Sequence, residues 1–311
     1  MTRPIRIGTR GSQLALWQAN QVAARLAEKG LESELRVIRT TGDLRRDVSL
    51  ASIGGKGLFI KEIEEALGRE EIDFAVHSLK DVPSVIPAAF RLAGFLERAD
   101  PRDAWVQPSG LRLDAIPAGA VIGTSSPRRR AQLLHHFPDV RIEEIRGNVD
   151  TRMEKLRQGL YHGAVLAAAG LTRLGRGAEI VEHFSLDRMI PAAGQGIVAI
   201  ETLGSRDEML EVARSITDPI AALAARIERG LLQRFETILD CTSAIGVHAA
   251  IDHPNITLRV FLSDGGLTRV VRFTEEGTAA RPDELIDRAA GRMRDEGAVE
   301  LLEEASRRAG R

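Results

Sequence analysis

Short apolar runs alternate with amphipathic segments through the first two thirds of the chain, and this alternation restricts its possible folds more than any other feature. Residues 5–9 are predicted to form a short strand, and residues 13–29 follow with helical spacing behind Ser12, a side chain suited to cap a helix. The same order of strand, helix and strand recurs at residues 34–40, 57–67 and 73–79. Such alternation predicts a mostly parallel sheet with helices on both faces.

The pattern begins again after a polar stretch at residues 97–118 that carries three prolines. We interpret this stretch as the crossing between two α/β domains. An apolar strand at residues 197–201 is then placed to return the chain to the first domain. The elements expected in the second domain are strands at 121–123, 141–145 and 164–168 and helices at 127–136 and 148–158.

The character of the chain changes once more near residue 217. Pro219 fits the first position of a helix, two β-rich segments follow at 256–262 and 267–273, and a helical tail closes the chain. This last part is expected to be a small α+β domain, and a length of 311 residues fits two or three domains. The predicted domains are residues 1–97 with 197–215, residues 98–196, and residues 216–311.

The charges nearly cancel, because 43 Lys and Arg residues stand against 44 Asp and Glu residues, for a formal net charge of −1. No overall field attracts nucleic acid or an anionic membrane, so we expect neither as a partner, and an anionic ligand must be bound by local clusters of cations. The longest apolar stretch, residues 164–171, is far too short to cross a bilayer, and the N-terminal residues show no signal peptide. A single cysteine permits no internal disulfide, and these features together predict a cytoplasmic protein.

The segment GTSSPRRR, residues 123–130, is the most informative about a ligand. Ser126 is placed to cap a helix, which sets Arg128 and Arg129 at the positive end of the helix dipole. Cations are unfavourable there by ~0.3–1 kcal/mol each, so arginines at such positions are candidates to bind carboxylate or phosphate together with the free backbone N–H groups. The alternative is an exposed cluster in an arginine-rich chain.

Further arginines follow other predicted strands. Asn148 is placed to cap the next helix, and Arg146 and Arg152 flank its start. Arg173 follows the strand at 164–168, and Arg10 follows the first strand. Ligands bind at the carboxyl ends of strands in open α/β sheets. Together these side chains predict a cleft lined with arginine that holds a ligand with many carboxylates.

Two further segments carry groups capable of chemistry. In HSLKDVP, residues 77–83, Lys80 and Asp81 end an apolar strand, where an ionised carboxylate can stabilise a developing cation or move a proton. A turn in which Asp81 bonds its own backbone is the alternative. Cys241, the only thiol, lies in the polar segment ILDCTSAIG, which favours a reactive loop thiol over a buried one. The glycine-rich GGKGLF, residues 54–59, lacks the spacing of a phosphate-binding loop, so a mobile loop is an equal alternative.

Eight motifs occur in order along the chain: TRGSQLALWQA, GGKGLF, HSLKDVP, DPRDA, GTSSPRRR, RGNVDTR, LAAAGLTRLG and PAAGQG. From about residue 5 to residue 246 this set resembles the hydroxymethylbilane synthase family, also called porphobilinogen deaminase. The resemblance implies an enzyme that joins four porphobilinogen molecules head to tail, releases ammonia each time, and frees the linear tetrapyrrole by hydrolysis. It also implies a dipyrromethane cofactor held by a thioether to a cysteine, and Cys241 is the only thiol available.

The resemblance also implies residue roles. Asp81 matches the catalytic aspartate, which bonds pyrrole N–H groups, assists loss of the amine and stabilises the azafulvenium cation. Gln195 lies in a segment that resembles the hinge strand, and Lys56 and Phe59 lie in a loop that resembles the active-site lid. The positions that match residues binding the carboxylates of cofactor and substrate are Arg10, Ser12, Lys80, Ser126, Arg128, Arg129, Arg146, Arg152 and Arg173. No metal is expected, and the protein is expected to be a monomer.

One segment departs from the family pattern. Leu239 and Asp240 precede Cys241, where the family has glycine or a small residue, and Ala244 stands in place of a proline. The departure affects the expected geometry of the loop and the charge beside the thiol more than the thioether chemistry.

Two other classes of function use the same features differently. The predicted fold class is α/β, with two doubly wound bilobal domains resembling type II periplasmic binding proteins and a small C-terminal α+β domain. A binding protein of that type would use the arginines but need neither Asp81 nor Cys241, and it would normally carry a secretion signal. A nucleic-acid-binding protein is disfavoured by the neutral charge and by an aromatic content of 4%.

Overall fold

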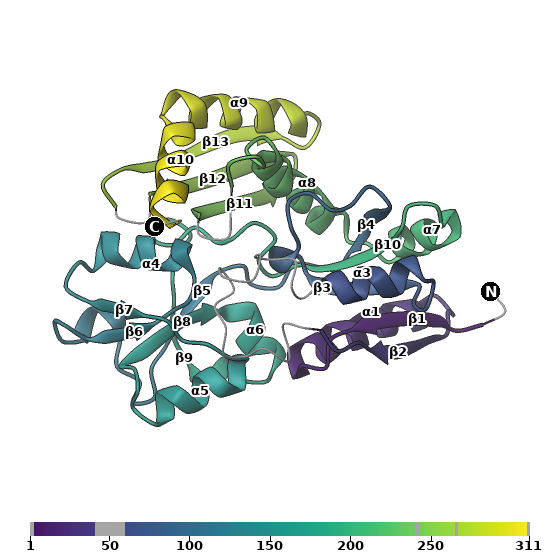
Figure 1. Ribbon diagram of the computed structural model, residues 1–311, viewed down its shortest axis with the longest axis horizontal. Coiled ribbons are helices and arrows are strands. Elements are labelled where there is room, and N and C mark those ends of the chain that lie inside the picture. Colours follow the sequence, from purple (N-terminus) through teal and green to yellow (C-terminus); the bar gives the residue numbers. More distant parts are fainter. Residues whose placement is uncertain (1–2, 41–59, 240–242, 265–266, 310–311) are drawn as a thin grey trace. The chain divides into compact units, whose positions relative to one another are not determined.

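The structure of the protein, a computed structural model, describes residues 3–40, 60–239, 243–264 and 267–309, with side chains described as far as residue 304. The chain forms two compact units, Met1–Ala99 with Gly196–Arg226 and Asp100–Gln195 with Ile227–Arg311. Each unit is built on a five-stranded sheet, and the second unit also contains a three-stranded sheet (Figure 1).

The sheet of the first unit has the strand order β2-β1-β3-β10-β4. Its strands are β1 (Ile5–Thr9), β2 (Ser33–Val37), β3 (Phe74–Ser78), β4 (Phe90–Phe95) and β10 (Val198–Leu203). β1 pairs in parallel with β2 and β3, whereas β10 is antiparallel to both β3 and β4. The expected α/β fold and the mostly parallel sheet are therefore confirmed, because β1, β2, β3 and β4 run in the same direction. The returning strand β10 is the exception and enters in the opposite direction.

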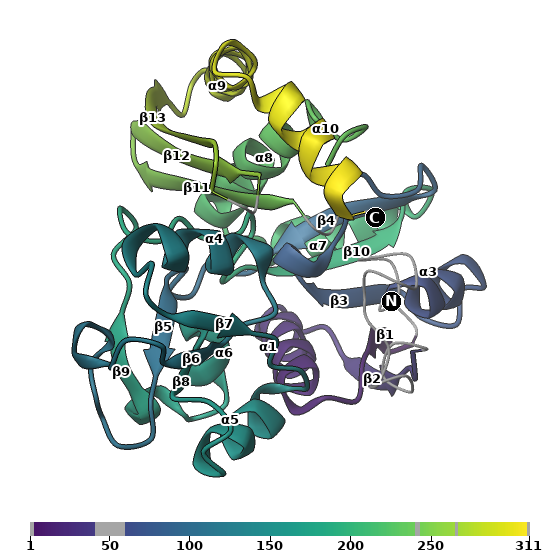
Figure 2. The same ribbon diagram turned by 60° about the vertical axis from the view of Figure 1, so that its left-hand side comes forward.

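Helices cover both faces of this sheet. The helices are α1 (Gln13–Glu28), α3 (Lys61–Gly68) and α7 (Asp207–Ser215), and a 3-10 turn (Leu79–Asp81) follows β3. Val22 of α1 and Met209 of α7 pack with Phe74 on one face, and Ile63 of α3 packs with Ala75 on the other. Successive side chains of β3 therefore pack into two apolar layers, one on each face of the sheet. Helix α1 lies beside β1 and β3 (Figure 2).

The sheet of the second unit has the strand order β7-β6-β8-β5-β9. Its strands are β5 (Asp103–Val106), β6 (Val121–Gly123), β7 (Arg141–Glu143), β8 (Gly163–Ala167) and β9 (Ile180–His183). The helices are α4 (Pro127–His136), α5 (Val149–Arg157) and α6 (Ala168–Arg173), with 3-10 turns at Leu113–Ala115 and Gly177–Glu179. β7, β6 and β8 are parallel neighbours, and β5 is antiparallel to β8 and β9.

The stretch at residues 97–118, which was interpreted as a polar crossing between domains, contains the buried strand β5. All four residues of β5 are buried, and Trp105 is 0% exposed. Gly163 of the neighbouring strand makes room for this indole, because a Cβ there would lie 2.1 Å from Trp105. This strand was not predicted because it has only four residues and prolines flank it on both sides.

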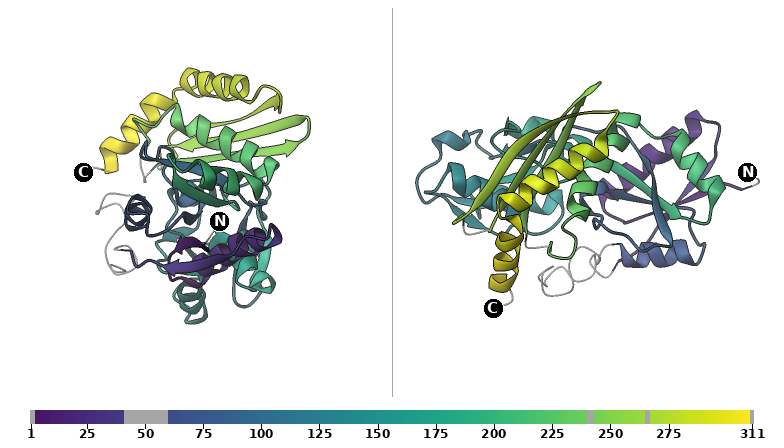
Figure 3. Two further views of the ribbon diagram at one scale, coloured as in Figure 1. Left: turned by 90° about the vertical axis from the view of Figure 1, so that its right-hand side faces the viewer. Right: turned by 90° about the horizontal axis from the view of Figure 1, so that it is seen from above.

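The remaining part of the second unit is an antiparallel sheet with helices. It consists of α8 (Pro219–Gln233, whose first turns belong to the first unit), β11 (Ala244–Asp252), β12 (Asn255–Ser263), β13 (Val270–Thr278), α9 (Pro282–Asp295) and α10 (Ala298–Ala309). Figure 3 shows α9 lying against this sheet. Ala244 and Phe261 of the sheet pack on Ala131 of α4. The assignment of residues 216–311 as a third domain stays a prediction.

Three helix starts agree with the side chains expected to cap them. Ser12 accepts a hydrogen bond from Ala15 N at 3.3 Å, and Ser126 accepts one from Arg129 N at 3.4 Å. Asn148 accepts one from Thr151 N at 2.9 Å. Element ends agree less well: β2 ends at Val37 rather than at residue 40, and α3 begins at Lys61.

Candidate functional site

In the first unit, four predicted site residues follow two neighbouring parallel strands. Arg10 and Ser12 come after β1, and Lys80 and Asp81 lie in the turn after β3. Because β1 and β3 run in the same direction, both loops lie at the carboxyl edge of the sheet. Asp81 is exposed and Lys80 is half-buried.

A hydrogen bond joins α1, which follows the first loop, to β3, which precedes the second. The side-chain amide of Gln18, buried on α1, donates to Ser78 Oγ at 2.7 Å, at the last residue of β3. The bond holds the end of β3 against α1 just before the turn that carries Asp81. The start of this turn is therefore held against α1, while the carboxylate of Asp81 is exposed to solvent.

In the second unit, the predicted site residues follow three neighbouring parallel strands. Ser126 comes after β6, Arg146 after β7, and Arg173 ends the helix after β8. Since these strands are parallel and adjacent, their carboxyl ends share one edge of the sheet. The structure thus collects at one edge the side chains that the sequence scatters over about fifty residues.

Arg128 and Arg129 point to a buried carboxylate. Arg128 Nη1 lies 2.6 Å from Asp103 Oδ2, and Arg129 Nε donates to Asp103 Oδ1 at 2.9 Å. The three side chains are 5%, 8% and 0% exposed, respectively. Burial raises the pKa of Asp103, but the charges and hydrogen bonds of the two guanidinium groups outweigh it and hold this pKa well below its usual range.

Gln195 belongs to the same cluster. Its side-chain amide donates to Asp103 Oδ1 at 3.0 Å and to the carbonyl oxygen of Pro101 at 2.7 Å. One carboxylate therefore connects the first turn of α4 with the PAAGQG segment. Asp103 is not among the predicted site residues, although a charged residue at the start of the apolar run DAWV was a signal that it is paired.

The other arginines differ in their surroundings. Arg146 Nε donates to Glu144 at 2.9 Å, and Arg152 Nε donates to the carbonyl oxygen of Gly147 at 2.8 Å. Burial lowers the pKa of Arg173 to about 10, which leaves its guanidinium charged at neutral pH. Gly147 allows the tight turn here, because its φ is +110° and a Cβ would lie 2.7 Å from Thr151.

Three predicted site residues, Cys241, Lys56 and Phe59, lie outside the described residues. Described residues follow the cysteine closely, because β11 begins at Ala244. A Cβ built on Gly246 would lie 3.2 Å from Arg128 Cδ, so β11 passes directly beside this arginine.

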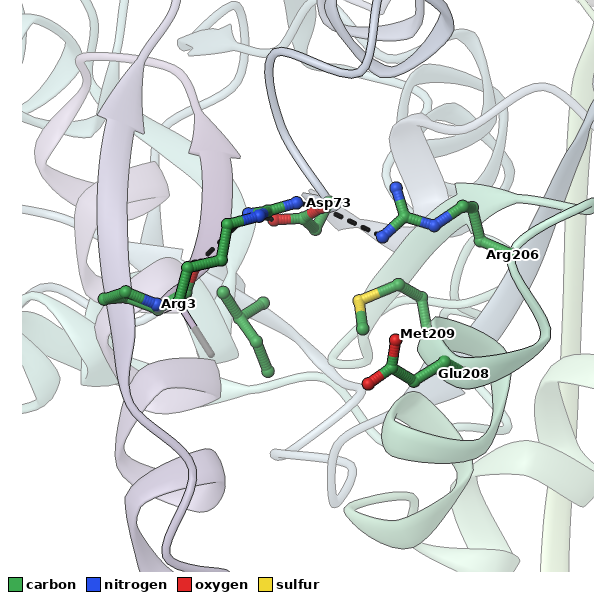
Figure 4. Close-up of a pocket in the computed structure, with 7 residues that line it drawn as sticks. Arg3, Asp73, Arg206, Glu208 and Met209 are labelled. Carbon is green, nitrogen blue, oxygen red and sulfur yellow. Dashed lines mark hydrogen bonds and ion pairs between the residues drawn. The ribbon is translucent and has the colours of Figure 1, made fainter. Parts of the chain in front are cut away.

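A cavity of about 250 Å³ lies elsewhere in the first unit, beside residues that are not among the predicted site residues. Figure 4 shows its lining: Arg3 and Arg206 reach Asp73 from two sides, at 2.7 Å and 3.5 Å. Glu208 also lines it, which adds a negative charge. The arrangement ties the N-terminal strand to the region before α7 and accounts for these charges without a ligand.

Within the described ranges, no helix is long and apolar enough to cross a membrane. No group of three or more His, Cys, Asp or Glu side chains in the described part of the chain is arranged as metal ligands would be.

Comparison with known proteins gives a consistent result. Residues 5–211 match the family described as porphobilinogen deaminase, dipyromethane cofactor binding domain. Porphobilinogen deaminase of Geobacter sulfurreducens is 43% identical over 306 residues, which cover 98% of this chain and 95% of that protein. Porphobilinogen deaminase of Syntrophotalea carbinolica is 46% identical over 266 residues, 84% of each chain.

Solved structures also resemble the chain. A periplasmic substrate-binding protein of an ABC transporter from Coxiella burnetii matches with a TM-score of 0.43 and 14% identity, over 71% of this chain and 95% of that one. The periplasmic VFT2 domain of BvgS from Bordetella pertussis matches with a TM-score of 0.40 and 13% identity, over 72% and 92%.

Proposed function

The chain belongs to the porphobilinogen deaminase family, and from this membership we propose the roles that its own residues play in the reaction. It is a transferase of tetrapyrrole and heme biosynthesis with a dipyrromethane cofactor. It joins four porphobilinogen molecules head to tail with release of ammonia, and it frees hydroxymethylbilane by hydrolysis.

The observation that carries the proposal is the group of arginines at the carboxyl edge of the second sheet. Two guanidinium groups face one carboxylate in the Arg128–Asp103–Arg129 cluster, so these three groups together carry a formal charge of +1 at the N-terminus of α4. Arg146, Arg152 and Arg173 belong to the same edge. A dipyrromethane with acetate and propionate groups fits this donor set, because planar guanidinium groups bind carboxylates with two parallel hydrogen bonds.

We assign the carboxylate-binding role to residues of both units. In the second unit they are Ser126, Arg128, Arg129, Arg146, Arg152 and Arg173, and in the first unit Arg10, Ser12 and Lys80. Nε and Nη2 of Arg128 take no part in its bonds to Asp103 and Ile190, and these donors are directed to the ligand in the proposal.

Asp81 is the proposed catalytic residue. Its carboxylate is exposed at the carboxyl edge of the first sheet and adjoins Lys80 in sequence. An ionised carboxylate there accepts hydrogen bonds from pyrrole N–H groups of porphobilinogen. As ammonia leaves, the ring becomes cationic, and the negative charge of Asp81 stabilises that cation. The same oxygen then takes up the proton that the attacked pyrrole loses.

Cys241 is the proposed attachment site of the cofactor, through a thioether. When bound, the dipyrromethane supplies the pyrrole carbon from which the chain grows. The contact between Gly246 and Arg128 supports this assignment, because it brings the segment just after the cysteine to the arginine cluster. Gln195 is proposed to act in a hinge segment, and Lys56 and Phe59 in a lid loop.

We further propose that the protein works as a cytoplasmic monomer without a nucleic-acid partner. A single cysteine and a net charge of −1 support this proposal. Light scattering of the purified protein tests the monomer, for which a mass of 33.9 kDa is expected.

Incubation of the purified protein with porphobilinogen tests the function. Ammonia and hydroxymethylbilane should appear in a ratio of about four to one, the ratio that the proposed reaction itself requires. The intact mass should show an adduct of two linked pyrrole units before substrate is added and further pyrrole units during turnover. A protein that binds porphobilinogen but releases no ammonia would instead be a binding protein that keeps the fold.

A further inference from the structure

Asp103 uses both carboxylate oxygens on side chains of the proposed site. Oδ2 accepts from Arg128 Nη1 at 2.6 Å. Oδ1 accepts from Arg129 Nε at 2.9 Å, lies 2.8 Å from Arg129 Nη2, and accepts from Gln195 Nε2 at 3.0 Å. Asp103 is the first residue of β5 and is fully buried, so its own position is set by the sheet.

The contacts of each guanidinium fix its plane. Arg128 Nη1 donates to Asp103 and also to the carbonyl oxygen of Ile190 at 2.7 Å, which fixes both hydrogens of this nitrogen. Arg129 Nη1 donates to the carbonyl oxygen of Val165 at 3.1 Å while its Nε edge faces Asp103. Because a guanidinium is flat and rigid, these bonds also determine where the remaining N–H groups point.

The carboxylate of Asp103 also balances part of the positive charge of Arg128 and Arg129. Without Asp103, two like charges would lie buried next to each other at the positive end of α4, an arrangement that burial and the helix dipole both disfavour. With Asp103 the three groups together have a formal charge of +1, which suits the binding of an anionic ligand. A neutral cluster would lose that attraction.

We propose that Asp103 is a positioning residue for the reaction: it orients Arg128 and Arg129 so that they bind carboxylates of the cofactor and of the growing chain. This inference rests on the proposed function. The role is assigned as indirect because Asp103 is fully buried and both of its oxygens accept hydrogen bonds from protein groups. Through Gln195 it also holds the PAAGQG segment to the same cluster.

The variant Asp103→Asn tests the role, and Asp100→Asn is the matched control. Asp100 lies three residues away and pairs with Arg102 at the surface, with side chains 28% and 42% exposed. Purified holoenzymes are compared for the fraction that carries the two-pyrrole adduct, by intact mass, and for KM and kcat per loaded molecule.

We expect Asp103→Asn to lower the fraction of molecules that carry the cofactor. KM for porphobilinogen should rise about tenfold, which corresponds to the loss of one charge-assisted hydrogen bond between an arginine and a carboxylate of the ligand, and kcat should change less than about threefold. Asp100→Asn should match the wild type. Wild-type loading and KM in a folded Asp103→Asn would overturn the inference.

A second variant covers the case in which Asp103→Asn does not fold. Asp103→Glu keeps the charge but moves the carboxylate by one methylene, so it should fold, load cofactor, and show a KM above that of the wild type by less than about tenfold. An unchanged KM in Asp103→Glu would leave Asp103 as a structural residue only and overturn its positioning role. Failure of the wild type to convert porphobilinogen would count against the proposed function instead, so the two failures are distinguishable.

Discussion

His77 Nε2 lies 3.1 Å from Glu201 Oε2 inside the first unit, where the two side chains are 6% and 0% exposed. His77 is on β3 and Glu201 on β10, so the contact joins two neighbouring inner strands of the sheet. A buried carboxylate needs a partner for its charge or its proton, and this histidine provides one.

The variant His77→Leu should destabilise the protein by about 3–5 kcal/mol, since it leaves the Glu201 carboxylate buried without its partner. Urea unfolding followed by circular dichroism measures the change. The double variant His77→Leu, Glu201→Met should recover much of the loss, because no buried charge remains. Equal or greater loss in the double variant would show that packing, and not the pair, stabilises this position.

Glu64 on α3 gives the fold a dependence on pH. Burial raises the pKa of Glu64 to about 7 and the nearby charge of Glu201 adds to this, while His77 acts in the opposite direction. The folded pKa is above the unfolded value of 4.5, so the folded state holds the proton of Glu64 more tightly than the unfolded chain does. The stability that this proton gives the fold is fully present below about pH 4.5 and is lost as the pH rises through about 7.

The variant Glu64→Gln removes this dependence. At pH 8.5 we expect it to be more stable than wild type by about 1 kcal/mol, a value reduced for partial exposure, or ~2–4 °C in Tm. At pH 4.5 the difference should vanish. Thermal unfolding at both values is the measurement, with Glu65→Gln, the exposed neighbour, as the control. A shift of equal size at both pH values would contradict the assignment.

Cys241→Ser should give a folded protein without the two-pyrrole adduct, because a hydroxyl does not replace the thiolate as the nucleophile. Intact mass spectrometry after incubation with porphobilinogen gives the result directly. Circular dichroism and the unfolding transition should match those of the unloaded wild type. Retention of the adduct in this variant would exclude Cys241 as its attachment site.

Asp81→Ala should keep the cofactor and lose turnover. A loss of about 10²–10⁴-fold in kcat is expected, the usual contribution of a positioned acid or base. The intact mass should still show the adduct, since attachment is assigned to Cys241. Glu71→Gln, which removes another exposed carboxylate of the same unit, should retain normal activity. Near-normal turnover in Asp81→Ala would rule out its catalytic role.

Sequence patterns located most elements that carry the proposed site, because these depend on local features. Ser12, Ser126 and Asn148 cap helices as expected, and each is recognisable from its neighbours. The site residues after β1, β3, β6, β7 and β8 follow from the alternation of strands and helices.

The partners of those residues could not be predicted in the same way. Asp103 meets Arg129 from 26 positions away, and His77 meets Glu201 from 124 positions away. Such pairs depend on strand order, and strand order depends on where the chain re-enters a sheet. The antiparallel direction of β10 was missed for the same reason, since an apolar run has the same composition in either direction.

The order of strands in the first sheet bears on how the chain emerges from the ribosome. β10 lies between β3 and β4 and hydrogen-bonds to both, yet it is synthesised about a hundred residues after them. Until then, the facing edges of β3 and β4 lack their permanent neighbour, and exposed edges are open to pairing with other chains. A nascent chain that stalls near residue 99 therefore exposes two strand edges that the complete unit covers.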